Sequence, residues 1–244
     1  MAHQSASVNN EEQAKFEKLG TQWWDINGPM KPLHAFTPTR TKYIEDQWDK
    51  HKSKSKNIET PINNLKIIDI GCGGGLLSEA LTQSGAKVTG VDLSAETIDI
   101  AQNHAKENGL TIDYRISTAE DLAKVGETAD IVVCSEVIEH VENQAAFLKT
   151  LTQLMAKDGL LILTTLNRTP ESLIFGKYVA EYILNLMPHG THDHSKFVKP
   201  SELNHWLDDT TKALVDVQGF KYNPFDNSFM FSRNTAINYG VCIK

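Results

Sequence analysis

The stretch Ile67–Leu81, IIDIGCGGGLLSEAL, places four glycines between a short apolar run and a helix-like pattern. Glycine adopts positive φ without a steric penalty and lets a ligand approach the main chain closely. The first turn of a helix offers backbone N–H groups that have no partner within the helix. The stretch therefore predicts a strand, a ligand-binding turn and a helix, which together open an α/β fold.

The same alternation continues along the chain. The sequence predicts strands at 65–70, 86–93, 111–116, 129–135 and 159–166, and helices at 75–85, 94–109 and 143–159. Strands separated by amphipathic helices form a parallel sheet with helices on both faces. Residues 212–244 contain β-rich runs split by NPFDN, which indicates an antiparallel pair at the end of the sheet. We therefore predict a Rossmann-like α/β fold with a mostly parallel seven-stranded sheet and an antiparallel last strand.

Composition narrows the class of protein. The 244 residues carry a formal net charge of -7, whereas general nucleic-acid binders usually display a basic face. The three cysteines, Cys72, Cys134 and Cys242, have no paired spacing, which favours a reduced, intracellular setting. There is neither an apolar signal core at the start nor a run of about 18 apolar residues anywhere. The sequence therefore predicts a cytoplasmic protein with no nucleic-acid partner.

Two regions are expected along the chain. Residues 1–60 form an aromatic-rich cap followed by a polar linker, and residues 61–244 form the ligand-binding domain with a helical insertion at about 168–200. Trp23 and Trp24 in the first region either wall the ligand pocket or simply anchor the cap.

The glycine turn discriminates between two ligand classes. Dinucleotides prefer G-x-G-x-x-G, whose third glycine corresponds here to Leu76, so the turn fits that pattern poorly. The pattern D-x-G-x-G-x-G suits S-adenosylmethionine instead. Asp69 can attract the amino group of its methionine part, while Gly71 and Gly73 leave room for that part against the backbone.

Two further acids follow the next two predicted strands. Asp92 ends the second strand, where a carboxylate can accept hydrogen bonds from both ribose hydroxyls; the alternative is a cap for the following helix. Glu120 or Asp121 follows the third strand and can meet the adenine amino group. All three positions fall on the carboxyl edge of the sheet, where open parallel sheets bind ligands. S-adenosylmethionine is therefore the predicted cofactor, with an NAD-dependent oxidoreductase as the disfavoured alternative.

A cluster of acids and one histidine follows the fourth predicted strand. Glu136, Glu139 and His140 have i, i+3, i+4 spacing, which places them on one face of a helical turn. Carboxylates and an imidazole can hold a divalent metal such as Mg²⁺, or His140 can act as a general base. The third interpretation is that these groups cap the next helix and bind one another.

Several longer motifs make the sequence resemble the ubiquinone-biosynthesis O-methyltransferases, which are class I S-adenosylmethionine-dependent enzymes. The resemblance is carried by WWDINGPMKPLH at 23–34, TPTR at 37–40, DIGCGGG at 69–75, EVIEHV at 136–141 and PHGTHDHSKFVKPSEL at 188–203. The glycine and acid motifs are shared by the whole superfamily, whereas the WWD segment and the GTHD loop are much more specific.

The resemblance implies roles for individual residues. Those implied to contact the cofactor are Arg40, Gly71, Asp92 and Val137, and those implied to hold a divalent ion are Glu136, Glu139 and His140. The forked guanidinium of an arginine suits the methionine carboxylate, although a plain surface arginine is the alternative. Two departures from the family pattern are minor. Val137 stands where the family often has methionine, and Thr37 stands where asparagine is common.

The resemblance also implies a substrate and a location. The expected reaction is O-methylation of a polyprenyl hydroxyphenol or catechol intermediate, and the rival is methylation of another small phenol. The stretch 170–187 reads as an amphipathic helix that either contacts a membrane surface or covers the pocket. His189, His192, Asp193 and His194 are interpreted as a substrate-covering loop. The expected location is cytoplasmic and peripheral on the inner face of a bacterial membrane, with a ubiquinone-biosynthesis complex as a partner.

Overall fold

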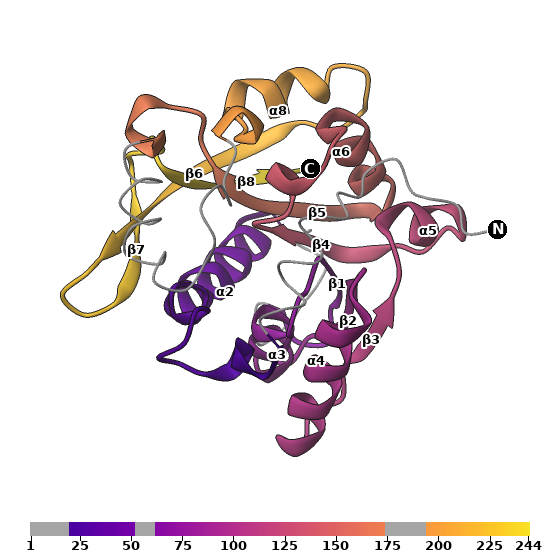
Figure 1. Cartoon of the computed structure of the whole chain (residues 1–244). Helices are drawn as coiled ribbons and strands as arrows, with labels where there is room; N and C mark the ends of the chain where they lie inside the picture. Colours follow the sequence, from indigo (N-terminus) through magenta and orange to yellow (C-terminus); the bar gives the residue numbers. More distant parts are fainter. Residues whose placement is uncertain (1–19, 52–61, 174–193) are drawn as a thin grey trace.

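The apolar run that precedes the glycine turn forms the centre of the parallel half of the sheet. The computed structural model describes residues 20–51, 62–173 and 194–244, and within them one eight-stranded sheet has the order β3-β2-β1-β4-β5-β8-β6-β7 (Figure 1). The parallel strands are β1 (Lys66–Ile70), β2 (Lys87–Asp92), β3 (Asp113–Ile116), β4 (Ala129–Ser135) and β5 (Met155–Leu166). β1 pairs in parallel with both β2 and β4.

The remaining strands complete the sheet in antiparallel fashion. These are β6 (Leu214–Asn223), β7 (Ser228–Ser232) and β8 (Asn238–Ile243). β8 lies between β5 and β6 and is antiparallel to both, and β7 pairs with β6 through the turn that contains Asn227 at a φ of 51°. The predicted antiparallel ending is therefore confirmed, but the sheet has eight strands where seven were predicted.

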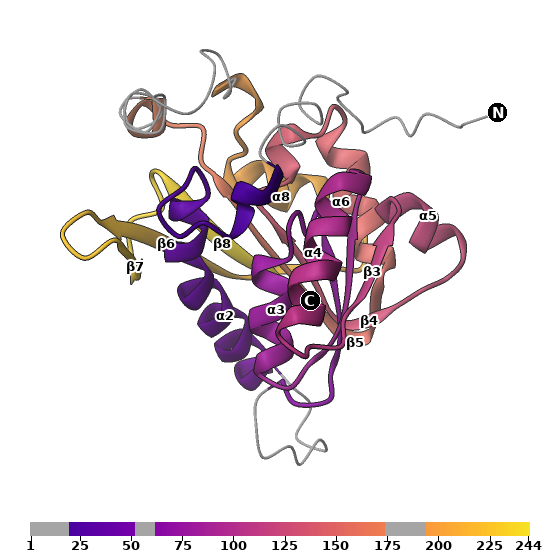
Figure 2. The same cartoon turned by 60° about the horizontal axis from the view of Figure 1, so that its bottom comes forward.

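Helices cover both faces of the sheet (Figures 1 and 2). The helices are α2 (Lys31–His51), α3 (Leu76–Gln83), α4 (Ala95–Glu107), α5 (Ala119–Lys124), α6 (Gln144–Gln153) and α8 (Pro200–Trp206). Short 3-10 turns are η1 (Gly20–Trp24), η2 (Ile138–His140) and η3 (His194–Lys196). α2 and α3 pack against one another on one face of the sheet, over one apolar cluster. α5, α6 and α8 lie on the other face and share a second apolar cluster.

Sequence signals account for the helix ends. Ser94 caps α4 by accepting from the backbone N–H of Thr97 at 3.3 Å, as the sequence predicts. Gly109, with a φ of 68°, follows the last turn of α4 in the left-handed conformation that glycine favours. Ser94 therefore marks the start of α4 at the carboxyl edge of the sheet, and Gly109 marks its end at the amino edge.

One predicted boundary is wrong. The sequence predicts a helix over 143–159, but α6 ends at Gln153 and β5 already begins at Met155. Met155 pairs with Ala129 at the start of β4, and the register shifts before the next paired residues. Leu154 and Met155 continue the helical spacing of apolar residues, but Leu154 is the C-cap of α6 and Met155 is already paired with the sheet.

The N-terminal region packs directly on the sheet domain. α2 lies against α3 and β7, and its Phe36, Tyr43 and Trp48 are buried in the same cluster as Ile67 of β1. Cys72, Cys134 and Cys242 are free and buried. None of the helices in the described ranges is long and apolar enough to cross a bilayer.

Some predictions fall outside the described residues. The helix predicted over 170–187 lies outside them from residue 174 onward, and so do His189, His192 and Asp193. The polar start and the 52–61 part of the linker lie outside them too.

Candidate functional site

The glycine turn between β1 and α3 has the backbone that its sequence predicts. Gly71 and Gly73 have φ values of 70° and 52°, a region that side-chain-bearing residues rarely adopt. The N–H groups of Gly71 and Cys72 both donate to Val91 O, at 2.8 and 3.0 Å, which ties the turn to β2. A Cβ added at Gly71 would lie 2.5 Å from Val137 Cγ2, so predicted Val137 packs directly against the turn.

The two predicted acids at the strand ends reinforce the turn. Asp92 Oδ2 accepts from the Gly73 N–H at 2.9 Å, and Oδ1 accepts from the Ser94 N–H at 3.0 Å. Asp92 therefore holds the glycine turn and binds the N–H of Ser94, the N-cap residue of α4, and each oxygen keeps a lone pair for a further donor. Asp69 is buried and accepts from Ser78 Oγ at 2.6 Å. Burial raises the pKa of Asp69 to about 6, against the opposing effects of this bond and of the nearby Arg40 charge.

Arg40 lies within α2, and only 4% of it is exposed, so the alternative of a surface arginine is wrong. Its guanidinium donates to Ser135 Oγ and to Thr37 Oγ1, both at 2.8 Å, and Nε is buried without a hydrogen-bond partner. Burial lowers the pKa of Arg40, while the charges of Glu136 and Asp69 act in the opposite direction. A buried cation held by hydroxyls, with one unsatisfied donor, suits an anionic ligand group such as a carboxylate.

Hydroxyl groups connect Arg40 to the acid cluster. Thr164 Oγ1 donates to Glu136 Oε1 at 2.8 Å, so Ser135 Oγ must donate to Thr164 Oγ1, also at 2.8 Å. Arg40 in turn donates to Ser135, which makes a continuous relay from the guanidinium to the carboxylate. Sequence reasoning missed Ser135 and Thr164. Their signal was available, because both stand at the carboxyl ends of predicted central strands.

The acid cluster departs from its predicted geometry. Glu136 has a φ of 58° and lies before the 3-10 turn η2, so it does not share a helical face with Glu139 and His140. Glu139 is buried and accepts from Thr165 Oγ1 at 2.9 Å, whereas His140 is partly exposed. Burial and the charge of Glu139 raise the pKa of Glu136 to about 7, opposed by the Thr164 bond and by Arg40.

The predicted metal set does not fit this arrangement. Among the residues the structure describes, no three His, Cys, Asp or Glu side chains stand together as ligands for one ion. Glu136 has a positive φ and precedes the η2 turn, and Glu139 accepts from Thr165 Oγ1 in the interior, so the three side chains do not share one helical face as predicted.

The third predicted acid site lies in the first turn of α5. Thr118 caps this helix by accepting from the Asp121 N–H at 3.0 Å. Asp121 is exposed and paired with Lys124 at 2.8 Å, whereas Glu120 is half-buried. The adenine contact of Glu120 or Asp121 stays a prediction, and Glu120 is the more buried of the two side chains.

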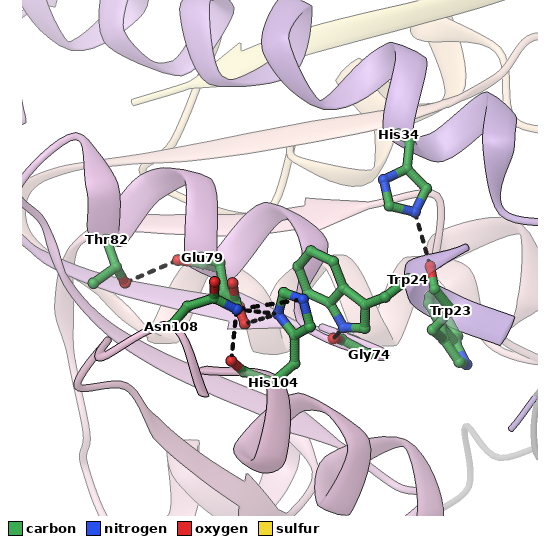
Figure 3. A network of polar contacts seen from close by, with 9 residues as sticks. Trp23, Trp24, His34, Gly74, Glu79, Thr82, His104 and Asn108 are labelled. Carbon is green, nitrogen blue, oxygen red and sulfur yellow. Dashed lines mark hydrogen bonds and ion pairs between the residues drawn. The ribbon is translucent and has the colours of Figure 1, made fainter. Parts of the chain in front are cut away.

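The aromatic cap covers the glycine turn. A Cβ at Gly73 would lie 2.4 Å from Trp23 Cη2, and one at Gly74 would lie 2.7 Å from Trp23 Cγ. Trp23 is buried with Leu76, the residue in place of a dinucleotide motif's third glycine. Trp24 Nε1 donates to Gly74 O at 3.0 Å (Figure 3). The cap is thus anchored on the turn itself, and the role of the tryptophans as a pocket wall stays a prediction.

The sequence is similar to a known protein family and to curated relatives over most of its length. The methyltransferase domain family matches residues 40–211. The chain is 40% identical to the ubiquinone biosynthesis O-methyltransferase of Coxiella burnetii (strain CbuK_Q154), over 99% of this chain and 98% of that one. It is 42% identical to the protein of the same description from Methylobacterium nodulans, over 98% and 96% of the two chains.

Solved structures support the fold. Magnesium protoporphyrin IX methyltransferase from Synechocystis PCC 6803 with bound SAH superposes with a TM-score of 0.63 at 20% identity, covering 96% of this chain and 99% of that one. A SAM-dependent methyltransferase from Aquifex aeolicus gives a TM-score of 0.57 at 13% identity, covering 95% and 97%.

Fold, glycine turn and family match together define an S-adenosylmethionine-dependent methyltransferase. The identity with curated relatives over nearly the full length is more specific. The chain belongs to the ubiquinone biosynthesis O-methyltransferase family.

Proposed function

We propose that this protein transfers a methyl group from S-adenosylmethionine to a phenolic oxygen of a polyprenyl hydroxyphenol or catechol intermediate of ubiquinone biosynthesis. Family membership supports the substrate class, because the relatives carry that pathway in their description. The observation that carries the donor site is Arg40, a buried guanidinium with an unsatisfied Nε beside the ends of the central strands.

The donor site follows from the residues around the glycine turn. Arg40 would take the methionine carboxylate, Asp69 the amino group, and Asp92 the ribose hydroxyls through its remaining lone pairs. Gly71 and Gly73 give the turn its positive-φ backbone, with Val137 packed on Gly71 and Trp23 packed on Gly73, and Glu120 would meet the adenine. The bound donor supplies an electrophilic methyl carbon whose bond to sulfur breaks as the aryl oxygen attacks in line.

The remaining chemical task is removal of the phenolic proton. A phenol has a pKa near 10, so a base must take its proton at neutral pH. Glu136, with its pKa raised to about 7, is ionised above that pH and still basic enough to accept a proton. We therefore assign Glu136 and His140 as the catalytic pair, with the proton moving to this pair as the aryl methyl ether forms.

The metal remains a prediction that the described residues do not favour. No three potential ligand side chains stand together among the described residues, and one carboxylate oxygen of Glu139 is bonded to Thr165.

Membrane contact and membership in a biosynthetic complex also remain predictions. The segment expected to touch a bilayer, 170–187, is described only as far as residue 173. Vesicle flotation of the purified protein tests that contact.

A methyl-transfer assay on purified protein with a short-tailed demethylated quinol tests the proposed reaction. We expect transfer to the phenolic oxygen, and His140→Ala should abolish turnover while SAH still binds in calorimetry. Transfer to simple catechols but not to the quinol would favour the rival, another small phenol. A parallel arm with EDTA tests the metal: loss of activity that Mg²⁺ restores would support it, and unchanged activity would refute it.

A further inference from the structure

A buried carboxylate–histidine pair lies behind the aromatic cap, away from the catalytic pair. Glu79 of α3 is buried, and its Oε1 lies 2.8 Å from Nδ1 of His104 in α4. The His104 side chain is 28% exposed, that of Glu79 only 4%. Burial raises the pKa of Glu79, and its contact with His104 acts in the opposite direction. A buried acid of this kind needs its partner, so the pair fixes the His104 ring.

The His104 ring in turn supports the cap. It is stacked on the Trp24 indole with ring centroids 3.4 Å apart and an interplanar angle of 7° (Figure 3). Trp24 also meets His34 edge-on with centroids 5.9 Å apart, and His34 Nε2 lies 2.9 Å from Trp23 O. Trp24 therefore contacts both a histidine of α2 and a histidine of α4.

The cap transmits this position to the glycine turn. Trp24 Nε1 donates to Gly74 O, and the neighbouring Trp23 indole packs on Gly73 and Gly74. A chain of direct contacts thus runs from Glu79 through His104 and Trp24 to the turn. None of its first three members belongs to the predicted cofactor contacts.

We propose that Glu79 and His104 are positioning residues that hold the tryptophan cap on the glycine turn and thereby set the affinity for the methyl donor. The inference rests on the proposed function, because it takes the glycine turn as the donor site. Its consequence is selective: loss of the pair weakens donor binding but leaves the methyl-transfer step intact, since neither residue reaches the reacting atoms.

Calorimetry with SAH and steady-state kinetics test this role. We expect His104→Ala to raise the Kd for SAH and the KM for the donor about tenfold, roughly the equivalent of one aromatic stack, with kcat at saturating donor unchanged. Glu79→Gln should produce a smaller rise. Because both residues act through one contact, adding Glu79→Gln to His104→Ala should produce no further rise.

His205 offers a matched control. It lies in the last turn of α8 and forms the same kind of pair with Asp208, just after that helix, at 2.8 Å, but the two side chains are 80% and 61% exposed. His205→Ala should leave donor Kd, KM and kcat unchanged. Trp24→Phe keeps a ring but loses the bond to Gly74 O, and should weaken SAH binding in the same direction as His104→Ala.

A spectroscopic measurement separates positioning from general destabilisation. The measurement is made on ligand-free protein. Introducing His104→Ala into the wild type should change its near-ultraviolet circular dichroism spectrum. Introducing His104→Ala into the Trp24→Phe variant should leave the spectrum of that variant unchanged. Equal SAH affinity in wild type and His104→Ala, or a fall in kcat without a change in Kd, would overturn the positioning role alone. A wild-type protein that fails to bind SAH would instead overturn the proposed function.

Discussion

Replacing Gly73 with alanine tests whether the cap and the glycine turn form one packed unit. The new Cβ would lie 2.4 Å from Trp23 Cη2 and 2.9 Å from Trp23 Cζ3, distances that Cβ atoms do not tolerate. Gly73 also has a φ of 52°. The left-handed backbone costs about 1 kcal/mol or more for alanine, and overpacking against a buried ring adds about 1–3 kcal/mol. We therefore expect Gly73→Ala to lower the free energy of unfolding by about 2–4 kcal/mol.

Gly109 provides the control for the backbone part. Its φ is 68°, but a Cβ there meets nothing within 4 Å. Gly109→Ala should therefore cost only the backbone contribution of about 1 kcal/mol. Urea unfolding of both variants measures the difference, which is the contribution of the collision with Trp23.

A double-mutant cycle identifies the partner. In a Trp23→Ala background the space beside Gly73 is open, so Gly73→Ala should cost about as little as Gly109→Ala does. The coupling between the two positions is then about 1–3 kcal/mol. If Gly73→Ala costs no more than Gly109→Ala in the wild-type background, or costs the same with and without Trp23, the packing of the cap on the turn is refuted.

Three further predictions concern the charges of the site. Burial raises the pKa of Asp69 to about 6, so the ionised carboxylate destabilises the fold above that pH. Asp69→Asn should therefore raise the free energy of unfolding by up to about 3 kcal/mol at pH 8. This gain should vanish near pH 4, and an equal gain at both pH values in urea unfolding would contradict it. Glu136→Gln should lower kcat about 10²-fold or more. The wild-type rate should fall as pH drops through about 7, because the Glu136 carboxylate becomes protonated. A flat pH–rate profile would exclude Glu136 as the base. Thr164→Val removes a bond that lowers the pKa of Glu136, so the midpoint of that profile should move to higher pH by about one unit, and a shift to lower pH would refute the relay.

Local patterns in the sequence determine most of the parallel half of the fold. The glycine turn, the strand ends at Ile70 and Asp92, and the cap at Ser94 each depend on neighbours within a few residues, so the sequence predicts them to within a residue. The boundary at Met155 was missed because its burial comes from pairing with Ala129, which lies 26 residues earlier in the chain.

The site shows the same limit. The spacing of Glu136, Glu139 and His140 suggests one helical face, but the positive φ of Glu136 is set by its backbone bond to Thr164 O on β5. Pairing of Glu79 with His104 depends on how α3 and α4 pack, which no local pattern encodes. Arg40 was placed at the donor site by resemblance, and the alternative interpretation was a surface arginine.

The position of β8 has a consequence for synthesis. Residues 238–243 fill the gap between β5 and β6, and Tyr239, Val241 and Ile243 are fully buried there. Until the ribosome has released this stretch, the nascent chain exposes the apolar edge of β5 and has no template for the β6–β7 hairpin. The parallel half can form early, because its contacts are between near neighbours in the sequence. The full sheet is complete only after β8 pairs with β5, and these strands are about 75 residues apart. Pairing of such distant segments is slow in folding.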